Sequence, residues 1–178
     1  MLFRSRFVDN PDYGSTGEAY SLSLAEGELR PGTLVAFGDI VLKRHIVQAL
    51  LEEADAGITL AADSALAGVD GPDRMMGDRP DSGRFSFEGV LLRAIGDTVP
   101  SAESHGKWIG LLHLGGDGAA WLRDAIAQAR ADGTLRTARL CDLLARVIAR
   151  GRPVRVVYSR GGWINVNNLA DLVDASGI

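Results

Sequence analysis

The sequence predicts an α/β fold in which helices cover a parallel sheet. Three observations support this prediction. Strand and helix patterns alternate along the first half of the chain, apolar residues make up 46% of the 178 residues, and no shift in composition marks a domain boundary. A chain of this length suits one domain with a full core, and strands alternating with helices through short connections are typical of parallel sheets. We therefore expect a single domain over residues 1–178.

The first half of the chain contains three predicted strands and two predicted helices. Ser15 or Thr16 can cap the first helix, and Pro31-Gly32 breaks it. The second helix is predicted because Ile46, Leu50 and Leu51 share one helical face. In chain order the elements are a strand at Leu2–Val8, a helix from Ser15 or Thr16 to about Leu29, a strand at Thr33–Phe37, a helix at Lys43–Glu53 and a strand at Gly57–Ala62.

The second half begins with a loop, because Ala67–Ser82 is rich in glycine, proline and aspartate and has no periodicity. Two short strands follow, and they could form a hairpin. Gly151 is expected to end the helix at Leu140–Ala149 at its C′ position. The remaining elements are strands at Arg84–Phe87, Val90–Ile95, Trp108–Leu114, Val154–Tyr158 and Trp163–Val166, and helices at Asp117–Ala131, Leu140–Ala149 and Leu169–Ala175.

Composition and charge argue against several classes of protein. The formal net charge of −4 and the absence of any Lys/Arg run longer than two residues argue against a nucleic-acid binder. No apolar stretch approaches the ~18 residues of a membrane span, and no signal-peptide pattern opens the chain. The single cysteine, Cys141, sits in a helical pattern and reads as a core residue rather than a nucleophile. These features predict a cytoplasmic protein in a reducing compartment.

The first candidate site residue is Asp39, which follows the apolar strand Thr33–Phe37 directly after Gly38. Ligands of open parallel sheets bind at the carboxyl ends of strands. Mg²⁺ prefers one or two carboxylates together with phosphate oxygens. Asp39 is therefore a candidate metal ligand, although the local sequence equally allows its side chain to cap the next helix.

The second candidate lies in Gly161–Leu172, where a glycine pair, a tryptophan and a short strand lead into the last helix. Asn167 and Asn168 stand at the start of that helix. Asparagine is a preferred N-cap residue, so capping is the favoured interpretation on local grounds. The amide oxygen of an asparagine can also bind Mg²⁺.

Two further segments could contact an anionic substrate. Asn10–Ala25 follows a predicted strand and opens a helix, so its backbone N–H groups could bind an anion. His105 and Lys107 flank the start of a strand beside Trp108, and the favoured local interpretation is a surface histidine and lysine next to a core tryptophan. Around the middle loop, three arginines could clamp a phosphate or phosphonate, although solvated loop charges are more common: Arg74, Arg79 and Arg84.

Taken in order, these segments resemble a nucleotidyltransferase-like domain. The resemblance is closest to the nucleotidyltransferases found with phosphoenolpyruvate mutase in phosphonate biosynthesis, which are similar to the cytidylyltransferases that activate 2-aminoethylphosphonate or phosphocholine. It spans Arg4 to Ala175 and rests on six stretches: NPDY…YSLSLA, VAFGDIVLKRHIVQALL, ADAGITLAADS, HGKWIGLL, LLARVIARGRPVRVVY and GGWINVNNLADL.

The resemblance implies a three-layer, Rossmann-like (GT-A-like) fold with a mixed, mainly parallel sheet and helices on both faces. It implies Mg²⁺-dependent transfer of a nucleotidyl group, specifically cytidylyl, from a nucleoside triphosphate to a phosphonate such as 2-aminoethylphosphonate. Family members carry an N-terminal glycine-rich loop with an Arg and a Lys, and this sequence does not contain it. The chain is therefore expected to be N-terminally truncated and to represent two-thirds or more of the family fold.

The resemblance also assigns site residues. Asp39 matches the Mg²⁺-binding aspartate after the central strand, and Asn167 matches the second metal-ligand position, which is Asp in many members and Asn in others. These two are the expected catalytic residues. Substrate contacts are expected from the matched stretches at Asn10, Thr16, Ser21, His105, Lys107 and Trp108. In the segment that contacts the acceptor, the family usually has Thr-Asn, whereas this chain has Thr16-Gly17. The chain therefore departs from the family pattern at the acceptor contact.

The sequence also allows other functions. A sugar-1-phosphate nucleotidyltransferase is a close variant, ranked lower because HGKWIGLL looks more like the phosphonate group. A non-catalytic domain that serves in ligand binding or assembly would also account for the missing glycine-rich loop. CTP and a phosphonate or phosphate acceptor are the expected ligands, with no nucleic acid and no membrane, and a homodimer or completion by another chain would cover the exposed sheet edge.

Overall fold

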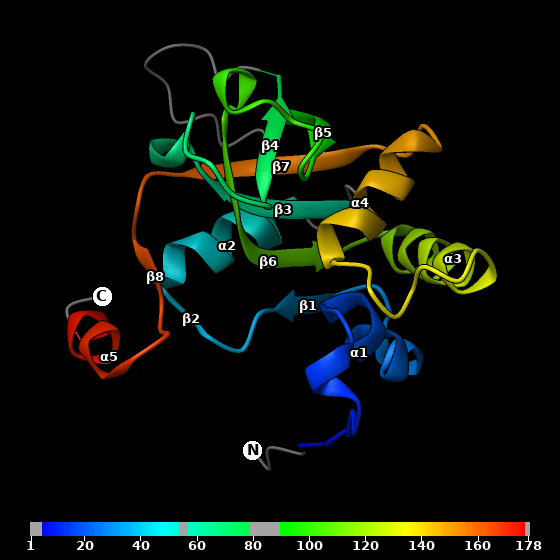
Figure 1. The fold of residues 1–178 in the computed structure, drawn as a ribbon. Helices are drawn as coiled ribbons and strands as arrows, with labels where there is room; N and C mark the ends of the chain where they lie inside the picture. Colours follow the sequence, from blue (N-terminus) through cyan, green and yellow to red (C-terminus); the bar gives the residue numbers. More distant parts are fainter. Residues whose placement is uncertain (1–4, 54–56, 79–89, 177–178) are drawn as a thin grey trace.

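The computed structural model describes residues 5–53, 57–78 and 90–176. Six strands form one sheet in the order β1-β6-β3-β7-β5-β4, and two more form a separate ribbon (Figure 1). The sheet strands are β1 (Thr33–Ala36), β3 (Ile58–Asp63), β4 (Arg74–Gly77), β5 (Val90–Ile95), β6 (Gly106–Leu114) and β7 (Val154–Ser159), and the ribbon strands are β2 (Ile40–Leu42) and β8 (Trp163–Asn165).

The sheet is mixed, as predicted, but its neighbouring strands are mostly antiparallel. β3 and β7 pair in parallel, from Ile58 opposite Val154 to Asp63 opposite Ser159. β6 lies between β1 and β3 and is antiparallel to both. The expectation of a mainly parallel sheet was wrong because β6, which is apolar and buried along nearly its whole length, takes a central position between two strands that run the other way.

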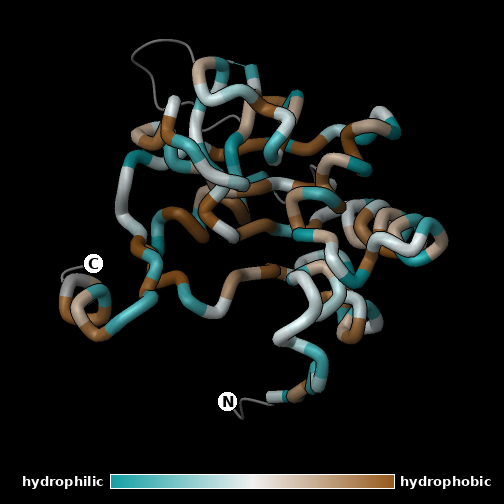
Figure 2. Tube along the Cα trace, in the orientation of Figure 1, coloured by the Kyte–Doolittle hydropathy of each residue, from teal (hydrophilic) through white to brown (hydrophobic). Residues whose placement is uncertain are grey.

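Helices pack against both faces of the sheet. The main core cluster joins α1 (Glu18–Leu24), α3 (Gly118–Ala131) and α4 (Leu140–Ala149) to the face that bears Leu60 and Ala62. A smaller cluster joins α2 (Arg44–Glu52) to the opposite face, which bears Ala61. Figure 2 shows hydrophobic colour along the central strands. No helix among the described residues is long and apolar enough to cross a membrane.

Several predicted elements are confirmed. α4 and α5 (Leu169–Ala175) have the predicted bounds, and so does β5. Gly151 adopts a φ of 73° directly after the C-cap of α4, as the C′ prediction requires. The strands β1, β3, β6, β7 and β8 and the helices α2 and α3 lie within about two residues of their expected bounds.

The N-terminal predictions were wrong in part. Residues 5–8 form no strand, and Phe7 is 94% exposed; the rest of the predicted strand Leu2–Val8 lies outside the described residues. The first helix ends at Leu24 instead of Leu29, and 3-10 turns precede and follow it at Tyr13–Ser15 and Glu26–Glu28. Its N-cap is Gly17, not Ser15 or Thr16. A strand needs a hydrogen-bonded neighbour, and apolar alternation alone does not supply one.

Two short strands were missed. β4 lies inside the predicted loop Ala67–Ser82, pairs with β5 and β6, and buries Met75 completely. β2 lies between Asp39 and the second helix and pairs with β8. The predicted strand at Arg84–Phe87 lies outside the described residues, and β5 pairs with β4 and β7. Further 3-10 turns occur at Ser64–Leu66 and Ser101–Glu103.

Candidate functional site

The carboxyl ends of three strands meet at one edge of the sheet. β1 and β7 both run in the direction of β3, since β6 is antiparallel to both β1 and β3 and β7 is parallel to β3. Asp39 follows β1, and Asp63 is the last residue of β3. Lys107 of β6 pairs with Asp63 in the ladder between those strands. Two carboxylates and a lysine therefore stand along this carboxyl edge.

The end of β1 is fixed by a close approach to β6. The Phe37 N–H donates to the Gly110 carbonyl at 2.9 Å. Gly110 has a φ of 81°, and a Cβ atom there would lie 2.2 Å from the Phe37 ring. Only glycine fits this position. The Phe37 ring also packs on Trp108, with 5.2 Å between ring centroids, so the turn at Gly38-Asp39 starts from a fixed point.

The ribbon of β2 and β8 brings Asp39 next to Asn167. Ile40 pairs with Asn165, and the Val166 N–H donates to the Asp39 carbonyl at 2.7 Å. Asn167 is the next residue, and both it and Asp39 are exposed. The two predicted metal ligands, far apart in the sequence, thus lie at the same end of one ribbon.

The structure separates the two asparagines by role. The Asn168 side-chain oxygen accepts from the N–H groups of Ala170 at 2.8 Å and Asp171 at 3.1 Å. The Asp171 carboxylate accepts in return from the N–H groups of Asn167 and Asn168. This reciprocal arrangement is a capping box, so Asn168 caps α5. Within the described residues, the Asn167 side chain has no hydrogen bond of its own and is available as a ligand.

Asp39 is likewise not a helix cap. β2 follows it, and α2 begins only at Arg44, with Lys43 as N-cap. In the described part of the chain the Asp39 side chain makes no hydrogen bond or ion pair, and it is exposed. The capping interpretation of this aspartate was therefore wrong, because a short strand separates it from the helix.

The donor set fits a divalent cation that also binds phosphate. Asp39 offers a carboxylate and Asn167 an amide oxygen, both hard oxygen ligands of the kind that Mg²⁺ accepts beside phosphate oxygens and water. The described residues contain no group of three or more His, Cys, Asp and Glu that could hold a metal by themselves. The pair therefore suits a metal that arrives with, or is completed by, a phosphate-bearing ligand.

Asp63 is a residue of this edge that the sequence analysis missed. Its side chain is 4% exposed. One carboxylate oxygen accepts from the Ala65 N–H at 2.8 Å, and the other accepts from the Gly161 N–H at 3.1 Å and the Trp163 Nε1–H at 2.8 Å. The available signal was an aspartate directly after a predicted, mostly apolar strand, which is similar to the signal that singled out Asp39.

The three predicted contacts near the start of β6 have different environments. His105 Nδ1 donates to the Gly77 carbonyl at 2.6 Å. Lys107 is half-buried, and its Nζ lies so close to Gly71 that a Cβ there would be 2.8 Å away. Trp108 is 3% exposed and donates from Nε1 to the Leu111 carbonyl. The prediction of Trp108 as a substrate contact was wrong, because its ring belongs to the core.

Lys107 keeps its charge available at the carboxyl edge. No ion pair of Lys107 occurs in the described residues. Burial raises the pKa of Asp73, and the nearby Lys107 charge partly offsets that rise. A half-buried ammonium of this kind can bind an oxyanion that reaches the edge of the sheet.

Asn10, Thr16 and Ser21 are brought together, but in another part of the molecule. The Asn10 side-chain N–H group donates to Thr16 Oγ1 at 3.0 Å and to Ser21 Oγ at 2.9 Å. Figure 1 shows α1 beside the start of β1, whereas Asp39 follows the end of that strand. No hydrogen bond or ion pair joins this cluster to Asp39 or Asn167 in the part of the chain that is described. In this structure the three side chains stabilise the turn that leads into α1.

The arginine clamp is not formed by Arg74. Its guanidinium donates to the Val99 carbonyl at 2.7 Å and pairs with Asp70 at 3.1 Å. These bonds hold the loops around β4 together. Arg79 and Arg84, the other two arginines of that prediction, lie outside the described residues.

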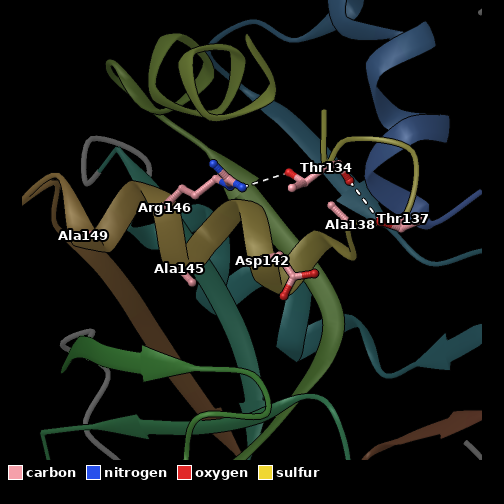
Figure 3. A pocket seen from close by; sticks show the side chains of 7 residues that line it. All are labelled: Thr134, Thr137, Ala138, Asp142, Ala145, Arg146 and Ala149. Atoms are coloured by element: carbon pink, nitrogen blue, oxygen red, sulfur yellow. Dashed lines mark hydrogen bonds between the residues drawn. The ribbon is translucent and has the colours of Figure 1, made fainter. Parts of the chain in front are cut away.

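A hollow lined by α4 and the loop before it offers less chemistry (Figure 3). Its one arginine, Arg146, is held by Asp132 at 2.6 Å and by the Thr134 hydroxyl at 2.9 Å. Thr137 donates to the Thr134 carbonyl. The Asp142 carboxylate accepts from the Arg139 N–H at 2.8 Å. The polar groups of this hollow thus have partners within the protein, and we do not assign it a ligand. Its lining residues are Thr134, Thr137, Ala138, Asp142, Ala145, Arg146 and Ala149.

Comparison with known proteins gives the fold. No family model matches the chain, and no curated protein matches it. Among solved structures, the inositol-1-phosphate CTP transferase from T. maritima matches with a TM-score of 0.65 and 15% identity, covering 94% of this chain and 64% of that one. The CTP:phosphocholine cytidylyltransferase from Streptococcus pneumoniae matches with a TM-score of 0.61 and 14% identity, covering 94% and 66%.

A third match is the UTP-bound UGPase from Acinetobacter baumannii, with a TM-score of 0.58 and 13% identity, covering 89% of this chain and 54% of that chain. The chain spans less than two-thirds of the length of each of these proteins. At such low identities the similarity is one of fold, and this chain has the fold of nucleotidyltransferases.

Proposed function

We propose that this chain takes part in Mg²⁺-dependent nucleotidyl transfer from a nucleoside triphosphate to an acceptor that bears a phosphate or phosphonate. The observation that carries the proposal is the placement of Asp39 beside Asn167 through the hydrogen bond from Val166 to the Asp39 carbonyl. Both side chains are exposed, and neither is used by a helix cap. The fold shared with two enzymes named for CTP favours cytidylyl transfer.

The residues of the carboxyl edge have separate tasks in this reaction. The Asp39 carboxylate and the Asn167 amide oxygen hold the metal. When bound, the metal neutralises charge on the α-phosphate and aligns the reacting oxygens. Lys107 binds an anionic oxygen of the acceptor. An acceptor oxygen then forms a bond to the α-phosphorus while the bond to pyrophosphate breaks, and no covalent enzyme intermediate is needed.

We further propose that the acceptor is a phosphonate. By its sequence resemblance the chain would use a phosphonate such as 2-aminoethylphosphonate. Lys107 supports any acceptor with a dianionic phosphorus group, because a lysine recognises it as a point charge rather than by its shape. A sugar 1-phosphate therefore meets the same electrostatic requirement. Comparing the activity with each acceptor distinguishes the two classes.

The test is pyrophosphate release by the chain with Mg²⁺, supplied with CTP or UTP and with 2-aminoethylphosphonate or glucose 1-phosphate. We expect release with CTP and the phosphonate, and its loss in Asp39→Asn. The matched control is Asp117→Asn, since Asp117 is an equally exposed carboxylate that precedes α3 and makes no cap hydrogen bond. Release that survives Asp39→Asn, or no release with any substrate pair, would contradict the proposal and favour a non-catalytic binding or assembly domain.

A further inference from the structure

Asp63 connects the sheet to the ribbon that carries the metal ligands. It is the last residue of β3, a strand buried at every position. Two of its three hydrogen bonds reach across to the turn before β8 and to the Trp163 side chain at the start of β8. All three partners are N–H donors, and a carboxylate accepts hydrogen bonds from such groups. A carboxylate is costly to bury unless hydrogen bonds of this kind stabilise its charge.

We propose that Asp63 is the positioning residue of the carboxyl edge: by holding Gly161 and Trp163 it fixes β8, and β8 in turn holds Asn167 beside Asp39. The effect of Asp63 on metal binding rests on the proposed function. Its effect on the position of β8 does not, because that position can be measured without any ligand.

In the described part of the chain, the only hydrogen bond from β8 itself to the sheet is the one from Trp163 Nε1 to Asp63, and the Trp163 ring also packs in the α2 cluster. β8 is three residues long, and its residues are half-buried or exposed. The helix that follows presents Leu169, Leu172 and Val173 to solvent, with exposures of 81%, 55% and 71%. A two-stranded ribbon by itself is only marginally stable in water. The position of the β2–β8 ribbon therefore depends on the points where it is attached to the sheet.

The attachment on the β8 side is the turn at Gly161 and Gly162. These glycines have φ values of 73° and 80°, in the left-handed region, and the Gly162 carbonyl accepts from the Lys43 N–H at 2.8 Å. The Asp63 carboxylate accepts from the first glycine and from the Trp163 ring, whose apolar part packs in the α2 cluster. Asp63 thus fixes both ends of this short segment relative to β3.

The consequence for the site follows from the ribbon ladder. Trp163 pairs with Leu42 at one end, and at the other the Val166 N–H donates to the Asp39 carbonyl. A displaced β8 would break this last bond and separate Asn167 from Asp39. Ser64 and Ser159 also link the ends of β3 and β7, through hydroxyl bonds to the Ser159 and Ala62 carbonyls, but those bonds do not reach β8.

Amide hydrogen exchange of the metal-free chain tests the inference. In Asp63→Asn, at least one N–H donor must face the new amide N–H₂ group, whichever way the amide turns. We expect the Val166 and Lys43 amides to exchange roughly ten- to hundred-fold faster relative to the amides of β3. Trp163→Phe, which removes one donor and leaves Asp63 in place, should give a smaller increase of the same kind and serves if Asp63→Asn fails to fold.

The control variant is Leu143→Ala, which opens a cavity in α4 at a fully buried position remote from β8. It lowers overall stability, so its Val166 and β3 amides should accelerate together. Unchanged relative exchange at Val166 in both Asp63→Asn and Trp163→Phe would overturn the inference.

A second arm measures binding of Mn²⁺ together with CTP to the same variants by electron paramagnetic resonance. The positioning role predicts a dissociation constant raised about tenfold or more in Asp63→Asn and unchanged in Leu143→Ala. Equal weakening in both variants would reduce Asp63 to a general stabilising residue and contradict the inference. If the wild-type chain did not bind Mn²⁺ even together with CTP, the proposed function would fail, and the exchange measurement would still decide the role of Asp63 in holding β8.

Discussion

β1 and β3 run in the same direction, and an aspartate stands at the carboxyl end of each, yet the two aspartates differ in almost every physical respect. Asp39 is exposed, and its side chain makes no hydrogen bond in the described residues. Asp63 is 4% exposed and accepts three hydrogen bonds. β1 lies at the edge of the sheet, whereas β3 lies between β6 and β7. The position of the two strands in the sheet thus accounts for a buried, hydrogen-bonded Asp63 and for an exposed Asp39, which we propose as a metal ligand.

The largest expected effect is on stability. Asp63→Ala should lower the free energy of unfolding by about 3 kcal/mol, because it leaves three N–H groups without their acceptor. Asp39→Ala should change it by less than about 0.5 kcal/mol, since that side chain is exposed and makes no hydrogen bond or ion pair in the described residues. Urea unfolding followed by circular dichroism measures both. Similar losses of unfolding free energy in the two variants would contradict the structural role that we assign to Asp63 but not to Asp39.

The two asparagines before α5 extend the same comparison to the other side of the site. Asn168→Ala should cost about 1 kcal/mol of local helix stability, because two N–H groups lose the cap oxygen. Asn167→Ala should leave α5 unchanged, since its side chain caps nothing. Exchange rates of the α5 amides report the difference. Equal acceleration in both variants would mean that Asn167 also supports the helix.

The sequence predicted the parts of this fold whose causes are local. α4 and α5 have the expected bounds because their spacing of apolar residues and their end signals lie within the helices themselves. β2 and β4 were missed because strands of three and four residues carry little pattern, and their pairing partners are distant in the chain. The antiparallel β6 between β1 and β3 also has no local signal, which is why the sheet was expected to be mainly parallel.

The candidate site divides in the same way. Asp39 and Asn167 were indicated by the resemblance, whereas their adjacency depends on a ribbon that the local sequence did not predict. Local capping rules allowed either asparagine as the cap, and the hydrogen bonds select Asn168. Asp63 was missed because the burial of a carboxylate depends on which segments fold over it. Trp108 was assigned to substrate although its size and apolar neighbours favour the core.

The opposite end of the β3–β6 ladder supplies a smaller, pH-dependent effect. There His113 pairs with Thr59 and is 2% exposed. Burial lowers the pKa of His113 below its ordinary 6.5 by disfavouring the imidazolium form. The unfolded chain then binds more protons near pH 6.5, so this contribution to stability is complete above that pH and is lost as the pH falls toward the lower folded pKa.

We therefore expect the free energy of unfolding to fall between pH 7 and pH 5, and to fall less steeply in His113→Gln. Urea unfolding at several pH values measures the two slopes. A steeper slope in the variant would contradict the assignment of this pH dependence to His113.

The smallest expected effect concerns Thr59, at the same end of β3. Its hydroxyl is fully buried and has no hydrogen-bond partner among the described residues. Thr59→Val should therefore be neutral or should raise the free energy of unfolding by up to about 1 kcal/mol, in contrast to the loss from Asp63→Ala on the same strand. A loss of stability in thermal unfolding would show that the hydroxyl has a role at that end.

The central claim is that Asp39 and Asn167 bind one metal ion together, and a double-mutant cycle of Mn²⁺ binding in the presence of CTP tests it most directly. Wild type, Asp39→Asn, Asn167→Ala and the double variant would be titrated by electron paramagnetic resonance. We predict one Mn²⁺ per wild-type chain, weaker binding in each single variant, and little further loss in the double variant, because both side chains act on the same ion. Affinity that is unchanged by either substitution, or losses that simply add, would contradict a shared site.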